Sequence, residues 1–132
     1  MKKIKYHIPY IIITIGIFSF SSFPGDKLPD LSFEFSDKLI HFTIYLMLMI
    51  SFFIAIYNAN EKNFLRKNPI IFSLIITILY GATDEIHQYF VPNRSCEIWD
   101  FIANTLGALT AGYFIYIYMK KKQNNTIQEN II

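Results

Sequence analysis

Residues 69–92 read PIIFSLIITILYGATDEIHQYFVP, an apolar stretch that ends in a group of ionisable and amide side chains. The apolar part is long enough to cross a bilayer, because a membrane-spanning helix needs about 20 mostly apolar residues. The polar group at its end comprises Asp84, Glu85, His87 and Gln88. Since an aspartate in hydrocarbon costs about 2.5–3.5 kcal/mol on insertion scales, such a cluster in a membrane helix indicates a functional site.

Three further stretches have the same apolar character, and together the four predict the fold. The chain has 132 residues, of which 53% are hydrophobic and 17% are charged, and this is too apolar for an ordinary soluble domain. The expected helices cover about Tyr6–Phe23, Lys38–Tyr57, Pro69–Phe90 and Trp99–Met119. We therefore predict an all-α membrane protein, in which residues 1–132 form a single four-helix transmembrane bundle. Residues 123–132 show no periodicity and are predicted to be a disordered tail.

The basic residues predict the orientation of this bundle. Nine of the 12 Lys and Arg residues flank the N-terminus, the loop between the second and third helices, and the end of the fourth: Lys2, Lys3, Lys5, Lys62, Arg66, Lys67, Lys120, Lys121 and Lys122. Because cytoplasmic loops carry the excess of Lys and Arg, both termini are expected to be cytoplasmic. The alternative, a cleaved signal peptide at residues 6–23, is less favoured because the apolar run exceeds the usual signal core.

Polar side chains recur at the outer ends of the second, third and fourth predicted helices. They form three pairs spaced four residues apart: Asp37 and His41, Asp84 and Gln88, and Asp100 and Asn104. Residues with this spacing share one face of a helix. With both termini inside, all three pairs lie on the extracytoplasmic side. At 1.5 Å per residue, Asp84 is about 9 Å below its helix end, and His41 and Asn104 are about 5–7 Å below theirs. We expect them to line one shared pocket.

Two neighbouring residues extend the predicted pocket. Tyr45 continues the face of the first pair one turn deeper into the membrane. Glu85 lies about 100° around its helix from Asp84, so the two acids cannot point the same way. Glu85 is therefore expected to meet a different neighbour, such as Lys38 or Arg94.

Structural roles compete with these functional ones. Asp37 stands where a helix cap is common, and Glu85 with Arg94 could form a simple salt bridge. Gln88 and Asn104 could serve only as hydrogen bonds between helices, which is a frequent role for amides in membranes. A row of small residues on the fourth helix lets a neighbouring helix pack closely; it consists of Ala103, Gly107 and Ala111.

The order of these residues also resembles a known family. The relevant motifs are Asp37-Lys38-x-x-His41-Phe42-x-x-Tyr45, Asp84-Glu85-x-x-Gln88-x-Phe90-x-Pro92-x-Arg94 and Asp100-x-x-x-Asn104-x-x-Gly107. They resemble the VanZ-like family of small bacterial membrane proteins, although Asn93 stands where that family usually carries Gly. The founding member is tied to resistance to the glycopeptide antibiotic teicoplanin. The resemblance therefore implies a role at the bacterial cell envelope, in a multi-pass protein of the cytoplasmic membrane, with a contribution to resistance as a further expectation.

The leading functional hypothesis is a ligand-binding pocket. Its ligand would be an envelope lipid, a lipid-linked cell-wall precursor or a glycopeptide, and no sequence feature indicates nucleic-acid binding. The candidate ligand-binding residues are Asp37, Lys38, His41, Tyr45, Asp84, Glu85, Gln88, Arg94, Asp100 and Asn104. Among these, Lys38 and Arg94 are the only anchors for an anionic group.

Two alternatives remain at this point. The first is a membrane-embedded hydrolase or transferase that uses Asp84, Glu85 and Asp100 as its acid and base groups. The second is a structural or partner-binding membrane protein whose polar residues hold the helices together. No cofactor is indicated, although the carboxylates and His41 offer ligands that suit a divalent cation. The paired-histidine spacings of common zinc sites are missing from the sequence.

Overall fold

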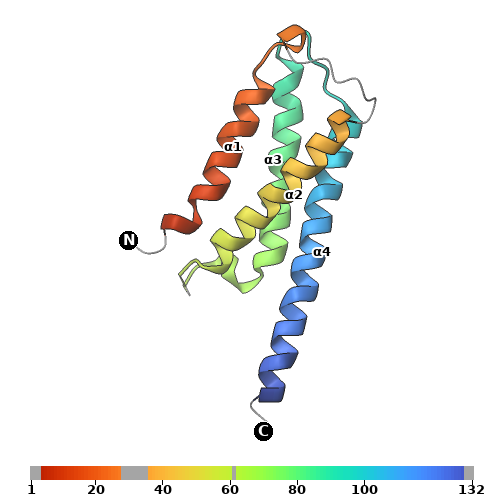
Figure 1. The fold of residues 1–132 in the computed structure, drawn as a ribbon. Helices are drawn as coiled ribbons and strands as arrows, with labels where there is room; N and C mark the ends of the chain where they lie inside the picture. Colours follow the sequence, from red (N-terminus) through yellow and green to blue (C-terminus); the bar gives the residue numbers. More distant parts are fainter. Residues whose placement is uncertain (1–3, 28–35, 61, 130–132) are drawn as a thin grey trace.

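The computed structural model describes residues 4–27, 36–60 and 62–129, and these residues contain four long helices (Figure 1). The long helices are α1 (Ile8–Ser21), α2 (Ser36–Tyr57), α3 (Pro69–Tyr89) and α4 (Ile98–Glu129). Short 3₁₀ turns lie at η1 (Ile4–Tyr6), η2 (Gly25–Lys27) and η3 (Phe64–Lys67). The part of the chain that the structure describes contains no strand. Four helical spans, one of which combines η1 with α1, are long and apolar enough to cross a membrane, so the predicted fold class is confirmed.

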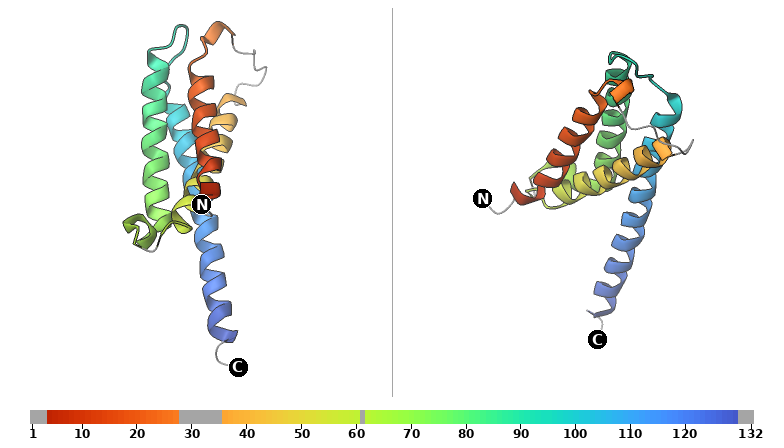
Figure 2. Two further views of the ribbon diagram at one scale, coloured as in Figure 1. Left: turned by 90° about the vertical axis from the view of Figure 1, so that its left-hand side faces the viewer. Right: turned by 45° about the horizontal axis from the view of Figure 1, so that its top comes forward.

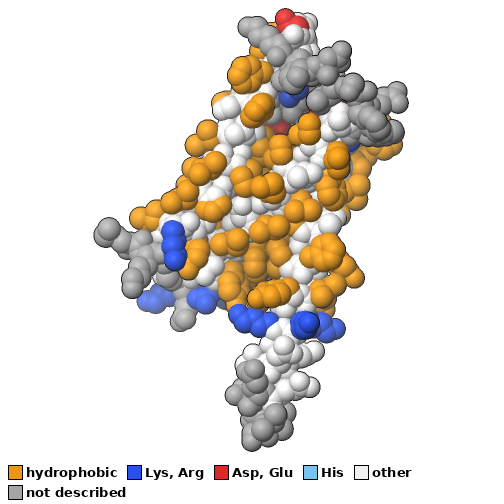
Figure 3. Space-filling view, in the orientation of Figure 1, with side chains coloured by type: hydrophobic (Ala, Val, Ile, Leu, Met, Phe, Trp, Pro, Cys, Tyr) orange, Lys and Arg blue, Asp and Glu red, His pale blue; other side chains and the backbone are white. Residues whose placement is uncertain are grey.

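The four helices form a bundle in which α1 and α4 lie on opposite sides of α2 and α3 (Figures 1 and 2). The N-terminal end of α1 and the C-terminal end of α4 lie at the same end of the bundle, and the α3–α4 connection lies at the other (Figure 1). Lys and Arg side chains gather at the end that carries the termini, below a broad apolar surface (Figure 3). The apolar surface is what a bilayer requires of a spanning bundle.

The closest packing joins α2 to α4 through the small residues of α4. Ala103, Gly107 and Ala111 are all buried, as the row of small residues predicted. A Cβ atom added to Gly107 would overlap the backbone carbonyl of Phe42, so the two helix backbones approach as closely as glycine permits. One turn away, Ala108 and Ala111 pack against the fully buried Met49.

The C-terminal helix is longer than the sequence predicted. α4 continues beyond Met119 to Glu129, through a segment expected to be a disordered tail. No Gly or Pro interrupts residues 120–129, and Lys and Gln are good helix formers. The side chains of residues 120–128 are all exposed, so this extension is a polar helix that leaves the bundle. Residues 130–132 of the expected tail lie outside the described residues.

A contact between two connections holds the opposite end of the bundle. The backbone N–H of Gly25 donates to the carbonyl of Pro92 at 3.1 Å, and a Cβ on Gly25 would overlap the carbonyl of Asn93. Asn93 itself has φ of 57°, a left-handed conformation that Asn tolerates better than most residues. Asn93 therefore adopts the turn conformation at the position where the family that this sequence resembles usually carries Gly. The next residue is Arg94.

Candidate functional site

Asp84 of α3 accepts hydrogen bonds from side chains of α1, α2 and α3 in a buried network. Its carboxylate is 6% exposed. Ser21 at the end of α1 donates to Oδ1 at 2.6 Å, and the Tyr45 hydroxyl of α2 donates to Oδ2 at 3.1 Å. Gln88, one turn further along α3, donates to Oδ2 at 3.3 Å. This carboxylate therefore has a neutral donor on each of α1, α2 and α3, which offsets the cost of its burial.

Glu85 is also buried, but it faces a different group of residues. Its side chain is 4% exposed and accepts hydrogen bonds from the Asn104 amide at 3.5 Å and the backbone N–H of Glu97 at 3.3 Å. His41 Nδ1 lies 4.0 Å from Glu85 Oε1 and 3.0 Å from Asn104 Oδ1. The two acids of α3 thus point to different neighbours, as their angular separation requires. Those neighbours are His41, Asn104 and Glu97, not Lys38 or Arg94.

Lys38 connects the start of α2 to the start of α4. Its ammonium lies 2.5 Å from Asp100, 2.7 Å from Glu97 and 3.3 Å from Asp37. Asp100 is 3% exposed, so Lys38 supplies the charge that this buried carboxylate needs. The hydrogen bond from Lys38, followed by one from Ser95, holds the pKa of Glu97 below its ordinary value.

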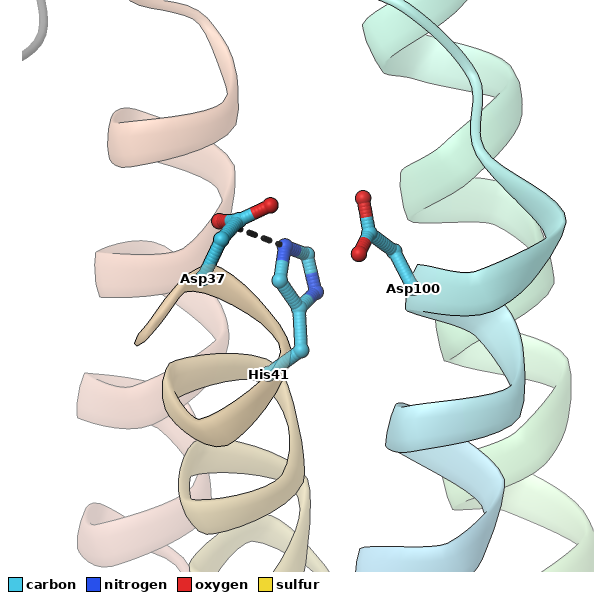
Figure 4. Close-up of side chains that lie close together, drawn as sticks. All are labelled: Asp37, His41 and Asp100. Carbon is cyan, nitrogen blue, oxygen red and sulfur yellow. Dashed lines mark ion pairs between the residues drawn. The ribbon is translucent and has the colours of Figure 1, made fainter. Parts of the chain in front are cut away.

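His41 lies close to both the Glu85 group and the Lys38 group. Its Nε2 is 3.7 Å from Asp37 Oδ1, and Asp100 stands on the facing helix (Figure 4). Because His41 also approaches Glu85 through its other ring nitrogen, it joins the α2 and α4 acids to those of α3. The hydrogen bond that the ring makes is with the Asn104 amide oxygen, to which a neutral imidazole donates from Nδ1.

A cavity of about 530 Å³ lies between α1 and α2 beside these networks. Its apolar walls come from Ile13, Gly16, Ile17 and Phe20 of α1 and from Ile40, Ile44 and Met47 of α2. Its polar lining consists of Ser21, Asp37, His41, Tyr45, Asp84 and Arg94. Phe20 and Met47 are 68% and 52% exposed, so the rim of the cavity reaches the outer surface of the bundle. The cavity is therefore amphiphilic, with hydrocarbon walls and polar groups in one lining.

Arg94 differs from Lys38 in having no carboxylate partner among the residues that the structure describes. No acid in the described ranges lies within salt-bridge distance of its guanidinium, and its buried Nε has no hydrogen-bond partner there. The sequence left open a simple salt bridge between Glu85 and Arg94. These two described residues do not form it in the structure. Arg94 instead lines the cavity between α1 and α2.

Residues 7–120 match the VanZ/LLP1 family. The chain belongs to that family. No curated protein and no solved structure shows a significant match to it.

The VanZ-type motifs fall into distinct places in this structure. Tyr45, Asp84 and Gln88 form the network that reaches α1, and Asn104 joins His41 and Glu85. Asp37, Lys38 and Asp100 form the ion-pair cluster between α2 and α4. The structure thus brings these candidate residues to one end of the bundle, where His41 lies within 4.0 Å of both Asp37 and Glu85.

Two residues of these networks were missed by the sequence argument. Ser21 donates the shortest hydrogen bond to Asp84, and Glu97 accepts from Lys38. Nothing in the sequence separates Ser21 from Ser19 and Ser22, because the choice depends on how α1 is rotated against α3. Glu97 precedes α4 directly, and acids at that position are usually explained as favourable partners of the helix N-terminus.

Two sets of side chains in this VanZ-family protein could hold a metal ion. They are Asp37, His41 and Asp100, and His41, Asp84 and Glu85, and the ligand atoms within each set lie within 4.8 Å of one another. Carboxylates with one imidazole suit a hard or borderline divalent cation. In the first set the Lys38 ammonium already contacts Asp100. The second set has no such competing cation among the described residues, and it fits a divalent ion better.

Proposed function

We propose that this VanZ-family membrane protein binds the head group of an amphiphilic envelope molecule in the cavity between α1 and α2. The ligand class comprises envelope lipids, lipid-linked cell-wall precursors and glycopeptides. By the positive-inside rule, the basic end of the bundle is in the bacterial cytoplasm and the cavity is near the outer leaflet. Both termini are then cytoplasmic.

The observation that carries this proposal is the amphiphilic lining of the cavity. A volume of about 530 Å³ falls within the 300–1,000 Å³ that is typical of ligand sites. Apolar side chains of α1 and α2 offer contact for a hydrocarbon chain, and Arg94, His41 and Asp37 offer polar contacts for a head group. A ligand that is itself part of the bilayer can enter at the rim near Phe20 and Met47, since both are exposed on the surface that would face lipid.

Co-purification of lipid tests the proposal. The full chain is extracted from a bacterial membrane in mild detergent, and bound lipids are identified by mass spectrometry. Asp84→Asn removes the charge at the centre of the network while it keeps the size of the side chain. We expect it to lose the ligand that the wild type retains. Asp26→Asn changes an exposed acid at the same end of the bundle and should retain the ligand. Equal retention by all three proteins contradicts the proposal.

A contribution to teicoplanin resistance belongs to the same proposal. Expression of the chain in a susceptible bacterium should raise the inhibitory concentration of teicoplanin, and Asp84→Asn should abolish the increase. Immunoblotting of the membrane fraction controls for the amount of protein. An unchanged inhibitory concentration at equal expression removes resistance from the proposal and leaves the ligand test untouched.

One contact favours a second candidate function, a hydrolase or transferase that acts on the bound molecule. The Ser21 hydroxyl donates to Asp84 at 2.6 Å, and both residues line the cavity. A hydroxyl beside a carboxylate, which is held in turn by a third group, is the arrangement of an activated nucleophile. A fluorophosphonate probe should then label the wild type and not Ser21→Ala. Absence of labelling in the folded wild type counts against this candidate.

The remaining candidates have tests of their own. If the polar residues serve only structure, Asp84→Asn and Asp100→Asn should lower the folded yield in proportion to any functional loss. If a divalent cation is bound by His41, Asp84 and Glu85, metal analysis of protein purified without chelator should find it, and His41→Gln should release it.

A further inference from the structure

Arg94, a cation in the cavity lining, narrows the chemical class of the ligand. Arg94 lines the cavity, and its Nε is shielded from solvent with no hydrogen-bond partner among the described residues. A buried donor without a partner costs about 1–3 kcal/mol, and more when the group is charged. The Arg94 side chain as a whole lines the cavity, so a ligand group that enters there can pair with its guanidinium.

The other charged groups around the cavity already have partners. Lys38 is held by Asp100, Glu97 and Asp37. Asp84 accepts hydrogen bonds from neutral donors on three helices. Arg94 is the cation of the lining that has no carboxylate within salt-bridge distance among the described residues. The complementary ligand group is an anion.

The shape of the guanidinium specifies the anion further. Its planar fork of N–H groups pairs with two oxygens of one group, and phosphate and carboxylate both offer such a pair. Phosphate is the anion that membrane lipids carry at the junction of head group and hydrocarbon chain. Arg94 and the apolar walls formed by α1 and α2 line the same cavity.

The apolar walls leave room for a hydrocarbon chain. Gly16 lines the cavity, and a Cβ atom added there would meet nothing within 4 Å. On either side, Ile13 and Ile17 of α1 face Ile40 and Ile44 of α2 across the same space. The absence of a side chain at Gly16 thus keeps open a channel between two apolar helix faces.

We propose that the ligand of this cavity is a lipid phosphate, whose hydrocarbon chain lies between α1 and α2 and whose phosphate pairs with Arg94. The inference rests on the proposed function and names its ligand class. Both parts of the ligand are required, because the apolar walls supply no affinity for a free phosphate and Arg94 supplies none for an uncharged lipid.

Native mass spectrometry of the full chain in detergent, with three probes, tests this inference. Dioleoyl phosphatidate carries chain and phosphate, dioleoylglycerol carries the same chains alone, and glycerol 3-phosphate carries the phosphate alone. The wild type should bind phosphatidate and neither of the other two. Binding of glycerol 3-phosphate with equal affinity would assign the site to soluble phosphate. Equal binding of dioleoylglycerol would remove Arg94 from recognition. Either result overturns the inference.

Two variants locate the binding. Arg94→Gln should weaken phosphatidate binding about tenfold or more, since a charge-assisted pair is lost. Gly16→Leu should also abolish binding, because its side chain fills the channel, while the helix gains a better helix former. Ile12→Leu, on an exposed position of α1, and Arg66→Gln, at the other end of the bundle, should bind phosphatidate as the wild type does. Unchanged binding by Arg94→Gln overturns the inference.

A stability measurement excludes an internal partner for Arg94. Asp30 and Glu34 lie in the segment 28–35, outside the described residues. If Arg94 is reserved for ligand, Arg94→Gln should leave the melting temperature of the delipidated protein unchanged or raise it, because no ion pair is broken and a buried donor without a partner is removed. A drop of several degrees would assign Arg94 to an internal pair and overturn the inference.

The lipid test also separates this inference from the proposed function. If phosphatidate fails to bind but another envelope molecule is retained by the wild type and lost in Asp84→Asn, only the phosphate assignment fails and the proposed function stands.

Discussion

Tyr45 shows how one hydroxyl contributes to a buried acid in this bundle. It is 1% exposed and donates to Asp84 at 3.1 Å. Tyr45→Phe removes that donor with little change in packing. It should lower the free energy of unfolding by about 1 kcal/mol, at the scale of side-chain hydrogen bonds within membrane bundles. Unfolding of the purified protein in mixed micelles measures the change. Tyr113→Phe, at an exposed position on α4, should have no effect, and equal effects would remove Asp84 from the explanation.

Glu97 gives a pH dependence whose sign follows from its partner. The Lys38 ammonium, and then the Ser95 hydroxyl, hold the pKa of Glu97 below its ordinary value of 4.5. A carboxyl whose pKa is lower in the folded state stabilises the fold above its unfolded pKa, and this contribution is lost as the pH falls through the folded pKa. Glu97→Gln should therefore flatten the loss of melting temperature on acidification below pH 4.5. Parallel pH profiles for the variant and the wild type would contradict this.

At the scale of the element, the contact between α2 and α4 depends on one missing side chain. A Cβ on Gly107 would overlap the Phe42 carbonyl, which is backbone and cannot rotate away. Gly107→Ala should therefore destabilise the bundle by about 1–3 kcal/mol, as overpacking does. Gly16→Ala is the matched control, since the same change in α1 meets nothing within 4 Å and gains about 0.5–1 kcal/mol of helix propensity. Thermal unfolding of both variants in detergent makes the comparison. Equal changes in stability in Gly107→Ala and Gly16→Ala would show that helix propensity, not packing, determines the stability of both variants.

Helical periodicity predicted which residues share a face, but it could not predict which helix each face meets. The four-residue spacing correctly put Asp37, His41 and Tyr45 on one face of α2, and the small residues of α4 indicated close packing. The partner of Glu85 depends on how α3 is rotated against α4, which is a property of tertiary packing. Hydropathy also marked the end of the membrane span near Met119, whereas helix propensity carries α4 on to Glu129.

At the scale of the whole molecule, the orientation in the membrane is the prediction on which the proposed site depends. Cys96 is an exposed, free thiol in the α3–α4 connection, at the end opposite the termini. If the basic end is cytoplasmic, a membrane-impermeant maleimide should label Cys96 in intact cells with a permeable outer envelope. Asn124→Cys in a Cys96→Ser background places the thiol on the exposed extension of α4, and it should react only in inverted vesicles. The reverse pattern would put the cavity and Arg94 on the cytoplasmic side, where a ligand of the outer leaflet could not reach them. The two thiols lie near opposite ends of α4 and test the same orientation. Poor access of the maleimide to one thiol therefore cannot be mistaken for an inverted orientation in the membrane.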